Sequence, residues 1–138
     1  MIRFIAEDIP LPELDENKIA RWIKRTAAGY EKKTGGINYV FCSDKRILEV
    51  NKQYLQHDYY TDIITFDYSN GNILSGDIFI SLDTVRSNAE TQNVLFEEEL
   101  KRIIIHGILH LCGQNDKSPE DKAEMTRKEN LALNAYWQ

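Results

Sequence analysis

One segment of the chain is too apolar to lie on a protein surface. It runs from Arg102 to Lys117 and reads Arg-Ile-Ile-Ile-His-Gly-Ile-Leu-His-Leu-Cys-Gly-Gln-Asn-Asp-Lys. As a helix it would be apolar on nearly every side, and such a helix is stable only when other elements cover it. We therefore expect a central, buried helix that begins near Glu97, with the rest of the chain packed around it.

The same segment carries two histidines at a metal-ligand spacing. Residues four apart project from one face of a helix, so His106 and His110 can close on a single ion. Gly113 follows at a place where helices commonly end in the left-handed conformation that glycine adopts without strain. The chain can then fold back and bring Asp116 to the same ion. The predicted ligands are therefore His106, His110 and Asp116.

Two imidazoles and one carboxylate suit zinc best, although nickel, iron or manganese is also compatible with them. Three protein ligands leave one position for water, as in catalytic zinc sites, and such a water ionises near pH ~7. Zinc proteases have a glutamate base directly after the first histidine, whereas this chain has Gly107, which disfavours a peptidase. The histidines can also be hydrogen-bonded core residues, with Asp116 capping the next helix.

Three segments of the chain, taken in order, resemble one known family. Residues 50–66 read Val-Asn-Lys-Gln-Tyr-Leu-Gln-His-Asp-Tyr-Tyr-Thr-Asp-Ile-Ile-Thr-Phe, residues 76–81 read Gly-Asp-Ile-Phe-Ile-Ser, and residues 106–113 read His-Gly-Ile-Leu-His-Leu-Cys-Gly. They resemble the corresponding segments of the YbeY-type single-strand-specific metallo-endoribonucleases of ribosomal RNA maturation. The metal motif matches every fixed position of the family signature His-Gly-x-Leu-His-Leu-x-Gly.

The resemblance implies a zinc-dependent endoribonuclease that acts in the maturation of the 3′ end of 16S rRNA and in ribosome quality control. Its implied partners are single-stranded RNA, the small ribosomal subunit and ribosome-assembly proteins. One alternative is a ribosome-assembly binding factor whose metal is largely structural and whose nuclease activity is weak or absent. A metal-dependent hydrolase of another bond, such as an amide or ester, also stays open.

Two positions depart from the family pattern. The third ligand is usually histidine, and Asp116 adds negative charge in its place, which should make the bound water less acidic. Where the family usually has an arginine thought to contact the scissile phosphate, this chain has Leu55, so a charge-assisted contact is lost. His57 and Lys117 are the weak candidates to replace that cation, and each can equally be a solvated surface side chain.

Two further features could support the site. Asp62 and Asp77 match family positions, and either could accept a hydrogen bond from a metal-binding imidazole; the sequence does not choose between them. A basic stripe runs along one face of the first predicted helix and could contact RNA phosphates, although it is more simply the solvated face of an amphipathic helix. Its residues are Lys18, Arg21, Lys24, Arg25, Lys32 and Lys33.

Length and patterning indicate one domain over residues 1–138, of the α+β class. The predicted elements are a strand at 2–6, a helix from Asp15 to Gly35-Gly36, a strand at 37–42, a helix after Ser43, a hairpin of strands 62–68 and 73–80, a helix from Ser81 to about Thr91, the metal helix, and a helix from Ser118-Pro119. They would form one small mixed sheet of about four strands packed with about five helices.

We see no signal peptide or membrane span, so the expected location is the cytoplasm. The net charge of -5 argues mildly against broad nucleic-acid affinity, but a local basic groove would suffice for RNA cleavage.

Overall fold

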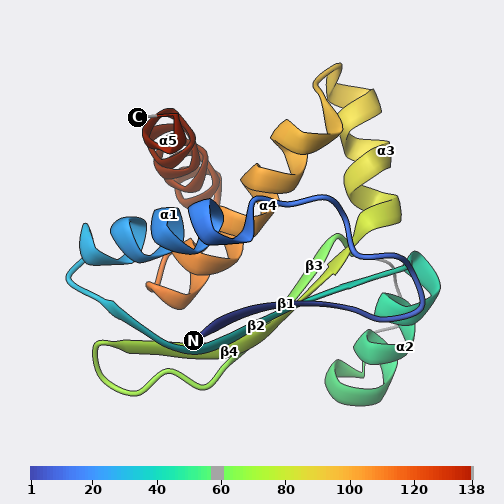
Figure 1. The fold of residues 1–138 in the computed structure, drawn as a ribbon, viewed down its shortest axis with the longest axis horizontal. Helices are drawn as coiled ribbons and strands as arrows, with labels where there is room; N and C mark the ends of the chain where they lie inside the picture. The colour runs from blue at the N-terminus through green and yellow to red at the C-terminus, as the bar shows by residue number, and fades with distance from the viewer. Residues whose placement is uncertain (57–60, 138) are drawn as a thin grey trace.

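The computed structural model describes residues 1–56 and 61–137, and this part of the chain forms one sheet and five helices (Figure 1). In chain order the elements are β1 (Ile2–Ala6), α1 (Glu16–Ala28), β2 (Lys33–Cys42), α2 (Asp44–Leu55), β3 (Ile63–Asp67), β4 (Ile73–Ser81), α3 (Leu82–Gln92), α4 (Phe96–Leu111) and α5 (Pro119–Tyr136). The predicted α+β class with four strands and five helices is confirmed.

The sheet is mixed, with strand order β1-β2-β4-β3. β1, β2 and β4 are parallel to one another, and β3 runs antiparallel to β4 at the edge. Parallel neighbours need a long crossover connection, and α1 provides it between β1 and β2. The predicted hairpin is the β3–β4 pair, which places residues 63–67 at the edge of the sheet below α4.

Helices cover both faces of the sheet. α1, α4 and α5 lie over one face, and α2 packs against the other (Figure 1). Side chains alternate along each strand, so Tyr39 and Phe41 of β2 enter the larger core under α4, whereas Cys42 enters a smaller core with Ile47 and Val50 of α2.

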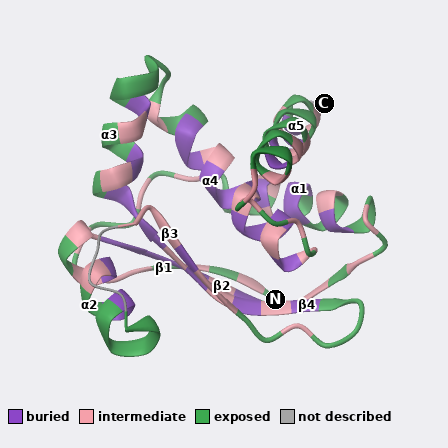
Figure 2. Ribbon diagram, turned by 180° about the vertical axis from the view of Figure 1, so that it is seen from behind, coloured by how far each residue is buried: buried purple, intermediate pink, exposed green. Residues whose placement is uncertain are grey.

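α4 is the buried centre of the fold, as its sequence predicts. Nine of its 16 residues are buried, and Figure 2 shows buried residues along this helix and along the strands beneath it. The hydroxyl of the fully buried Tyr39 donates a 2.7 Å hydrogen bond to the Ile104 carbonyl, which joins the sheet to the helix. Gly107 faces the sheet, and a Cβ at this position would lie 3.1 Å from the Cδ1 atom of Ile78. Helix and sheet therefore approach closely where a protease would carry its glutamate.

The helix starts were predicted well, but the end of the first helix was not. Ser43, Ser81 and Ser118 cap α2, α3 and α5 with their side chains. α1, however, ends at Ala28, and the Gly35-Gly36 pair lies inside β2, where the pairing with β4 is irregular.

The reason is a close approach between strands. A Cβ at Gly35 would lie 2.8 Å from the Ser75 hydroxyl oxygen of β4, so glycine is needed here for strand packing and not as a helix stop. Lys32 and Lys33, predicted as part of the basic stripe, consequently lie beyond the helix. Arg21, Lys24 and Arg25 are exposed on α1 as expected, and their role in RNA binding stays a prediction.

Gly76 in β4 offers a test of this packing. A Cβ there would lie 2.3 Å from the Phe66 carbonyl oxygen of β3, and backbone atoms cannot yield as a side chain can. We expect Gly76→Ala to lower the free energy of unfolding by about 3 kcal/mol, measured by urea denaturation. Gly36→Ala is the matched control, because no neighbouring atom lies within 4 Å of a Cβ at that position. Equal stability of the two variants would contradict the close β3–β4 approach.

Candidate metal centre

The structure brings the three predicted ligands together. His106 and His110 project from the last turns of α4, and Gly113 follows with a φ of 100°, which lets the chain fold back toward the helix. Asp116 lies in the loop before α5, where its Oδ2 atom is 3.4 Å from the Nε2 atom of each histidine. The ligand atoms all lie within 4.8 Å of one another. The three side chains can therefore reach one ion.

The other nitrogen of each imidazole ring has its own hydrogen-bond acceptor. His106 Nδ1 lies 2.6 Å from Glu129 Oε2, and His110 Nδ1 lies 2.8 Å from the Gln114 carbonyl oxygen. Both acceptors favour the tautomer with the proton on Nδ1, which leaves the Nε2 lone pairs free and directed toward Asp116. Imidazoles that bind metal through Nε2 need this tautomer. The donor set and its orientation fit a divalent transition metal such as zinc.

The ligands line an open cleft of about 490 Å³ between α4 and the edge strand β3. The described residues that line it are Thr61, Asp62, Ile63, Thr65, Asp67, His106, His110 and Asp116. Alternate residues of β3 face the cleft because strand side chains alternate. This lining contains three carboxylates and no lysine or arginine, which makes the cleft favourable for a cation.

This chain is similar to known proteins along nearly its whole length. The family model described as Endoribonuclease YbeY matches residues 2–137. The chain belongs to the YbeY endoribonuclease family. Proteins named Endoribonuclease YbeY from Parabacteroides distasonis and Bacteroides fragilis are 63% and 60% identical to it over 132 residues. The matches cover 96% of this chain and 93% and 95% of those two relatives.

A solved structure extends the likeness to the fold. The solution structure of TM1509 from Thermotoga maritima has a TM-score of 0.69 to this chain at 26% sequence identity. The match covers 99% of this chain and 89% of that one. The predicted YbeY membership, and with it the α+β architecture, is confirmed. In the described part of the chain, no helix is both long and apolar enough to cross a bilayer.

The prediction that Asp62 or Asp77 accepts from a metal-binding imidazole was wrong. Asp77 lies on the opposite face of β4 from the α4-facing Ile78 and accepts a 3.0 Å hydrogen bond from Asn38. Asp62 lines the cleft, but the Nδ1 atoms bond to Glu129 and to the Gln114 carbonyl. Both acceptors come from chain that follows the metal helix.

Sequence reasoning missed Glu129 because its link to His106 depends on how α5 crosses α4. One signal was available: the buried stripe of α5 consists of Met125, Glu129, Ala132 and Tyr136, so a carboxylate occupies an otherwise apolar face. A charged residue at such a position is buried only when it is paired.

Of the two candidate replacements for the YbeY-family arginine, only Lys117 lies in the described part of the chain. Leu55 is the last residue of α2 and is 39% exposed. Lys117 is exposed and is not among the residues that line the cleft, while His57 lies outside the described residues. The part of the cleft that the structure describes thus presents no cationic side chain other than a protonated histidine.

The electrostatics of the cleft are dominated by the carboxylates of Asp62 and Asp116, which line it, and of Glu129, which is buried behind it. Burial lowers the pKa of His106, but the hydrogen bond and charge of Glu129, together with the charges of Asp116 and Asp62, outweigh it and leave the pKa raised. Burial raises the pKa of the Asp62 carboxyl, and the attraction of His106 offsets only part of that effect. At neutral pH an ionised Asp62 therefore costs folding free energy, because the unfolded chain ionises this group more readily.

We expect Asp62→Asn to raise the melting temperature of the metal-free protein at neutral pH. The gain should shrink as the pH falls and disappear below the unfolded pKa of ~4, because Asp62 is then neutral in both states. Thermal unfolding followed by circular dichroism at several pH values measures this. Asp67→Asn, an exposed carboxylate of the same cleft, is the matched control and should change stability little. A lower melting temperature for Asp62→Asn at neutral pH would contradict the conclusion that an ionised Asp62 costs folding free energy.

Proposed function

We propose that this protein is a zinc-dependent, single-strand-specific endoribonuclease that acts in maturation of the 3′ end of 16S rRNA and in ribosome quality control. The observation that carries the proposal is the convergence of His106, His110 and Asp116 at an open cleft with both Nε2 atoms free. The endoribonuclease names of the P. distasonis and B. fragilis relatives, which match along nearly the whole chain, support the reaction class.

Each side chain of the centre has a distinct task in this proposal. His106 and His110 would hold the metal through Nε2, and Asp116 through a carboxylate oxygen. When bound, zinc would supply a Lewis acid for a phosphate oxygen and lower the pKa of a water molecule. Glu129 and the Gln114 carbonyl keep the two rings in the binding tautomer. Thr65 lines the cleft with a hydroxyl group that can donate a hydrogen bond to a phosphate, whereas the Thr61 hydroxyl already donates to the Ile63 carbonyl.

The charge of the cleft sets what the metal must contribute. Asp62, Asp67 and Asp116 would repel RNA phosphates, and the net charge of the chain is -5. A divalent ion would offset two of these negative charges at the point where the scissile phosphate binds. Tight RNA binding must then rely on contacts beyond the cleft, for which the exposed cations of α1 are candidates. The proposed setting is the cytoplasm, with the small ribosomal subunit and ribosome-assembly proteins as partners.

The alternative is a ribosome-assembly binding factor with a largely structural metal. The absence of lysine and arginine from the described cleft lining, with Leu55 in place of the family arginine, favours this alternative. The openness of the cleft favours catalysis, because structural zinc sites are closed by four protein ligands. We therefore favour a catalytic metal site in an endoribonuclease over a structural metal site in a binding factor.

Metal content tests the site directly. We expect close to one zinc per chain in the wild-type protein, purified without a histidine tag and measured by elemental analysis. His110→Ala and Asp116→Ala should lose most of it, because each removes one of three ligands. Lys117→Ala, next to the third ligand but outside the cleft lining, should keep its zinc. Full retention in Asp116→Ala would show that the third ligand is a different residue.

Cleavage of a single-stranded RNA tests the reaction. We expect His110→Ala to lower the cleavage rate on the order of 100-fold or more, because the metal would be lost with its Lewis acidity. A duplex of the same sequence should be cut much more slowly by the wild type. Equal cleavage by wild type and His110→Ala would point to a contaminating nuclease and would favour the binding factor.

A further inference from the structure

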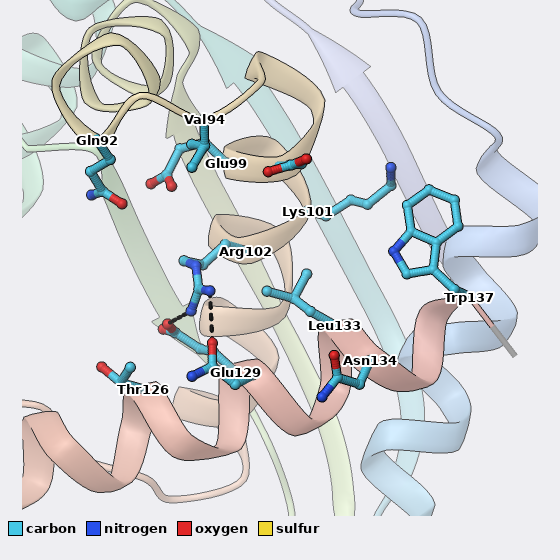
Figure 3. A pocket seen from close by; sticks show the side chains of 12 residues that line it. Gln92, Val94, Glu99, Lys101, Arg102, Thr126, Glu129, Leu133, Asn134 and Trp137 are labelled. Atoms are coloured by element: carbon cyan, nitrogen blue, oxygen red, sulfur yellow. Dashed lines mark hydrogen bonds and ion pairs between the residues drawn. The ribbon is translucent and has the colours of Figure 1, made fainter.

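A second pocket lies on the side of Glu129 that faces away from the metal centre. It has a volume of about 590 Å³ and lies between α4, α5 and the end of α3 (Figure 3). Arg102 of α4 reaches across it toward α5, where it meets Glu129 (Figure 3). Arg102 also bonds to Asn130 of the same helix. Glu129 thus stands between this pocket and the metal centre.

The two oxygens of the Glu129 carboxylate have different partners, one toward the pocket and one toward the metal centre. Its Oε1 atom accepts a 2.8 Å hydrogen bond from Nη1 of Arg102, and its Oε2 atom lies 2.6 Å from Nδ1 of His106. Nη2 of Arg102 donates a further 2.8 Å hydrogen bond to Asn130 Oδ1. Glu129 is only 7% exposed, so water contributes little to holding its carboxylate. The orientation of this group is set by the two donors.

We propose that Arg102 is a positioning residue of the metal centre, which fixes the Glu129 carboxylate so that His106 presents Nε2 to the metal. This inference rests on the proposed function in so far as the metal is concerned. Its structural core, the Arg102–Glu129–His106 chain of hydrogen bonds, stands on the geometry alone. Arg102 itself touches neither the metal ligand atoms nor the cleft.

The two imidazoles are held in different ways. His110 donates to a main-chain carbonyl, that of Gln114, whose loop is fixed by Lys128 bonded to the Gln114 side chain at 2.7 Å. His106 depends on a carboxylate at the end of a side chain with several rotatable bonds. A charged acceptor orients the ring more strongly than a carbonyl, but only if the carboxylate itself is held in place. Arg102 meets that need.

α5 has contacts with the rest of the protein other than the Arg102–Glu129 ion pair. This helix is already fixed to α1 by a 2.7 Å hydrogen bond from Trp22 Nε1 to the Ala132 carbonyl. Its Met125 and Tyr136 side chains are also buried. Holding α5 in place therefore does not depend on Arg102 alone, whereas the contact of Arg102 with the acceptor of His106 is specific to the metal centre.

The variant Glu129→Gln distinguishes a positioning role of Arg102 from a purely structural one. His106 and Arg102 meet different oxygens of Glu129, so a glutamine side chain in the same orientation directs its one oxygen at one of them and its NH₂ group at the other. In Glu129→Gln the NH₂ group therefore faces another donor, which is either Nδ1 of His106 or the guanidinium of Arg102. Removing the guanidinium with Arg102→Met frees the oxygen for His106. The double variant should therefore recover part of what Glu129→Gln loses, which is opposite to the sum of two structural defects.

The experiment is zinc affinity of the full chain, measured by competition with a chelator near neutral pH. We expect Glu129→Gln to bind zinc about 10–100-fold more weakly than wild type, and Arg102→Met up to about tenfold more weakly. The double variant should bind about tenfold more tightly than Glu129→Gln alone. Arg102→Lys keeps a cation for Glu129 and should bind zinc nearly as tightly as wild type. The matched control is Glu120→Gln, which changes an exposed acid of α5, the helix that also carries Glu129.

A second readout needs no metal. Nitrogen NMR of the His106 ring in the zinc-free protein, recorded at a pH high enough for the ring to be neutral, should show one tautomer, with the proton on Nδ1, in the wild type. Arg102→Met and Glu129→Gln should each give a mixture of tautomers, and the double variant should return toward one. Circular dichroism confirms that each variant is folded; if Arg102→Met does not fold, Arg102→Gln replaces it in the same comparison.

The two readouts distinguish this inference from the proposed function. Wild-type protein that binds no zinc but shows the expected tautomer shifts would overturn the metal site and keep Arg102 as a positioning residue. Wild-type protein that binds zinc, with Arg102→Met unchanged in zinc affinity and in tautomer, would keep the metal site and overturn the role of Arg102.

Discussion

The fold depends on the burial of α4 more than on any other single constraint. This helix is apolar on most of its surface, so it has to be covered by the sheet on one side and by α1, α3 and α5 on the others. The close approach at Gly107 and the Tyr39 hydroxyl bonded to the Ile104 carbonyl fix its depth and its rotation over the sheet. Its last turns reach the edge strand β3, and His106 and His110 are therefore presented at the cleft by the same packing that forms the core.

The cleft is costly to the fold in the way that functional sites commonly are. Three carboxylates line it and a fourth, Glu129, is buried behind it, while burial raises the pKa of Asp62. Without a cation at the ligand position the carboxylates of Asp62 and Asp116 repel each other, and an ionised Asp62 opposes folding. A bound divalent metal would relieve that repulsion, so in our proposal metal binding and folding stability support each other.

At two positions this chain departs from the pattern that its resemblance to the YbeY family leads us to expect. Asp116 stands where the resemblance leads us to expect histidine, and its Oδ2 atom is equally distant, at 3.4 Å, from both Nε2 atoms. A carboxylate makes the ligand set one charge more negative than three histidines would. With Leu55 in place of the usual arginine, the positive charge that meets a phosphate in the described cleft would come from the metal alone. Other cations that contact the RNA would have to lie outside it.

What the sequence determined by itself was local. The four-residue spacing of the histidines, the left-handed Gly113, the serine caps and the apolar character of α4 all follow from interactions within a few residues, and each was predictable. The tertiary structure alone decided what meets across the core. It placed Glu129 rather than Asp62 or Asp77 against His106, and it used Gly35 for strand contact, because both outcomes depend on elements that approach from distant parts of the chain.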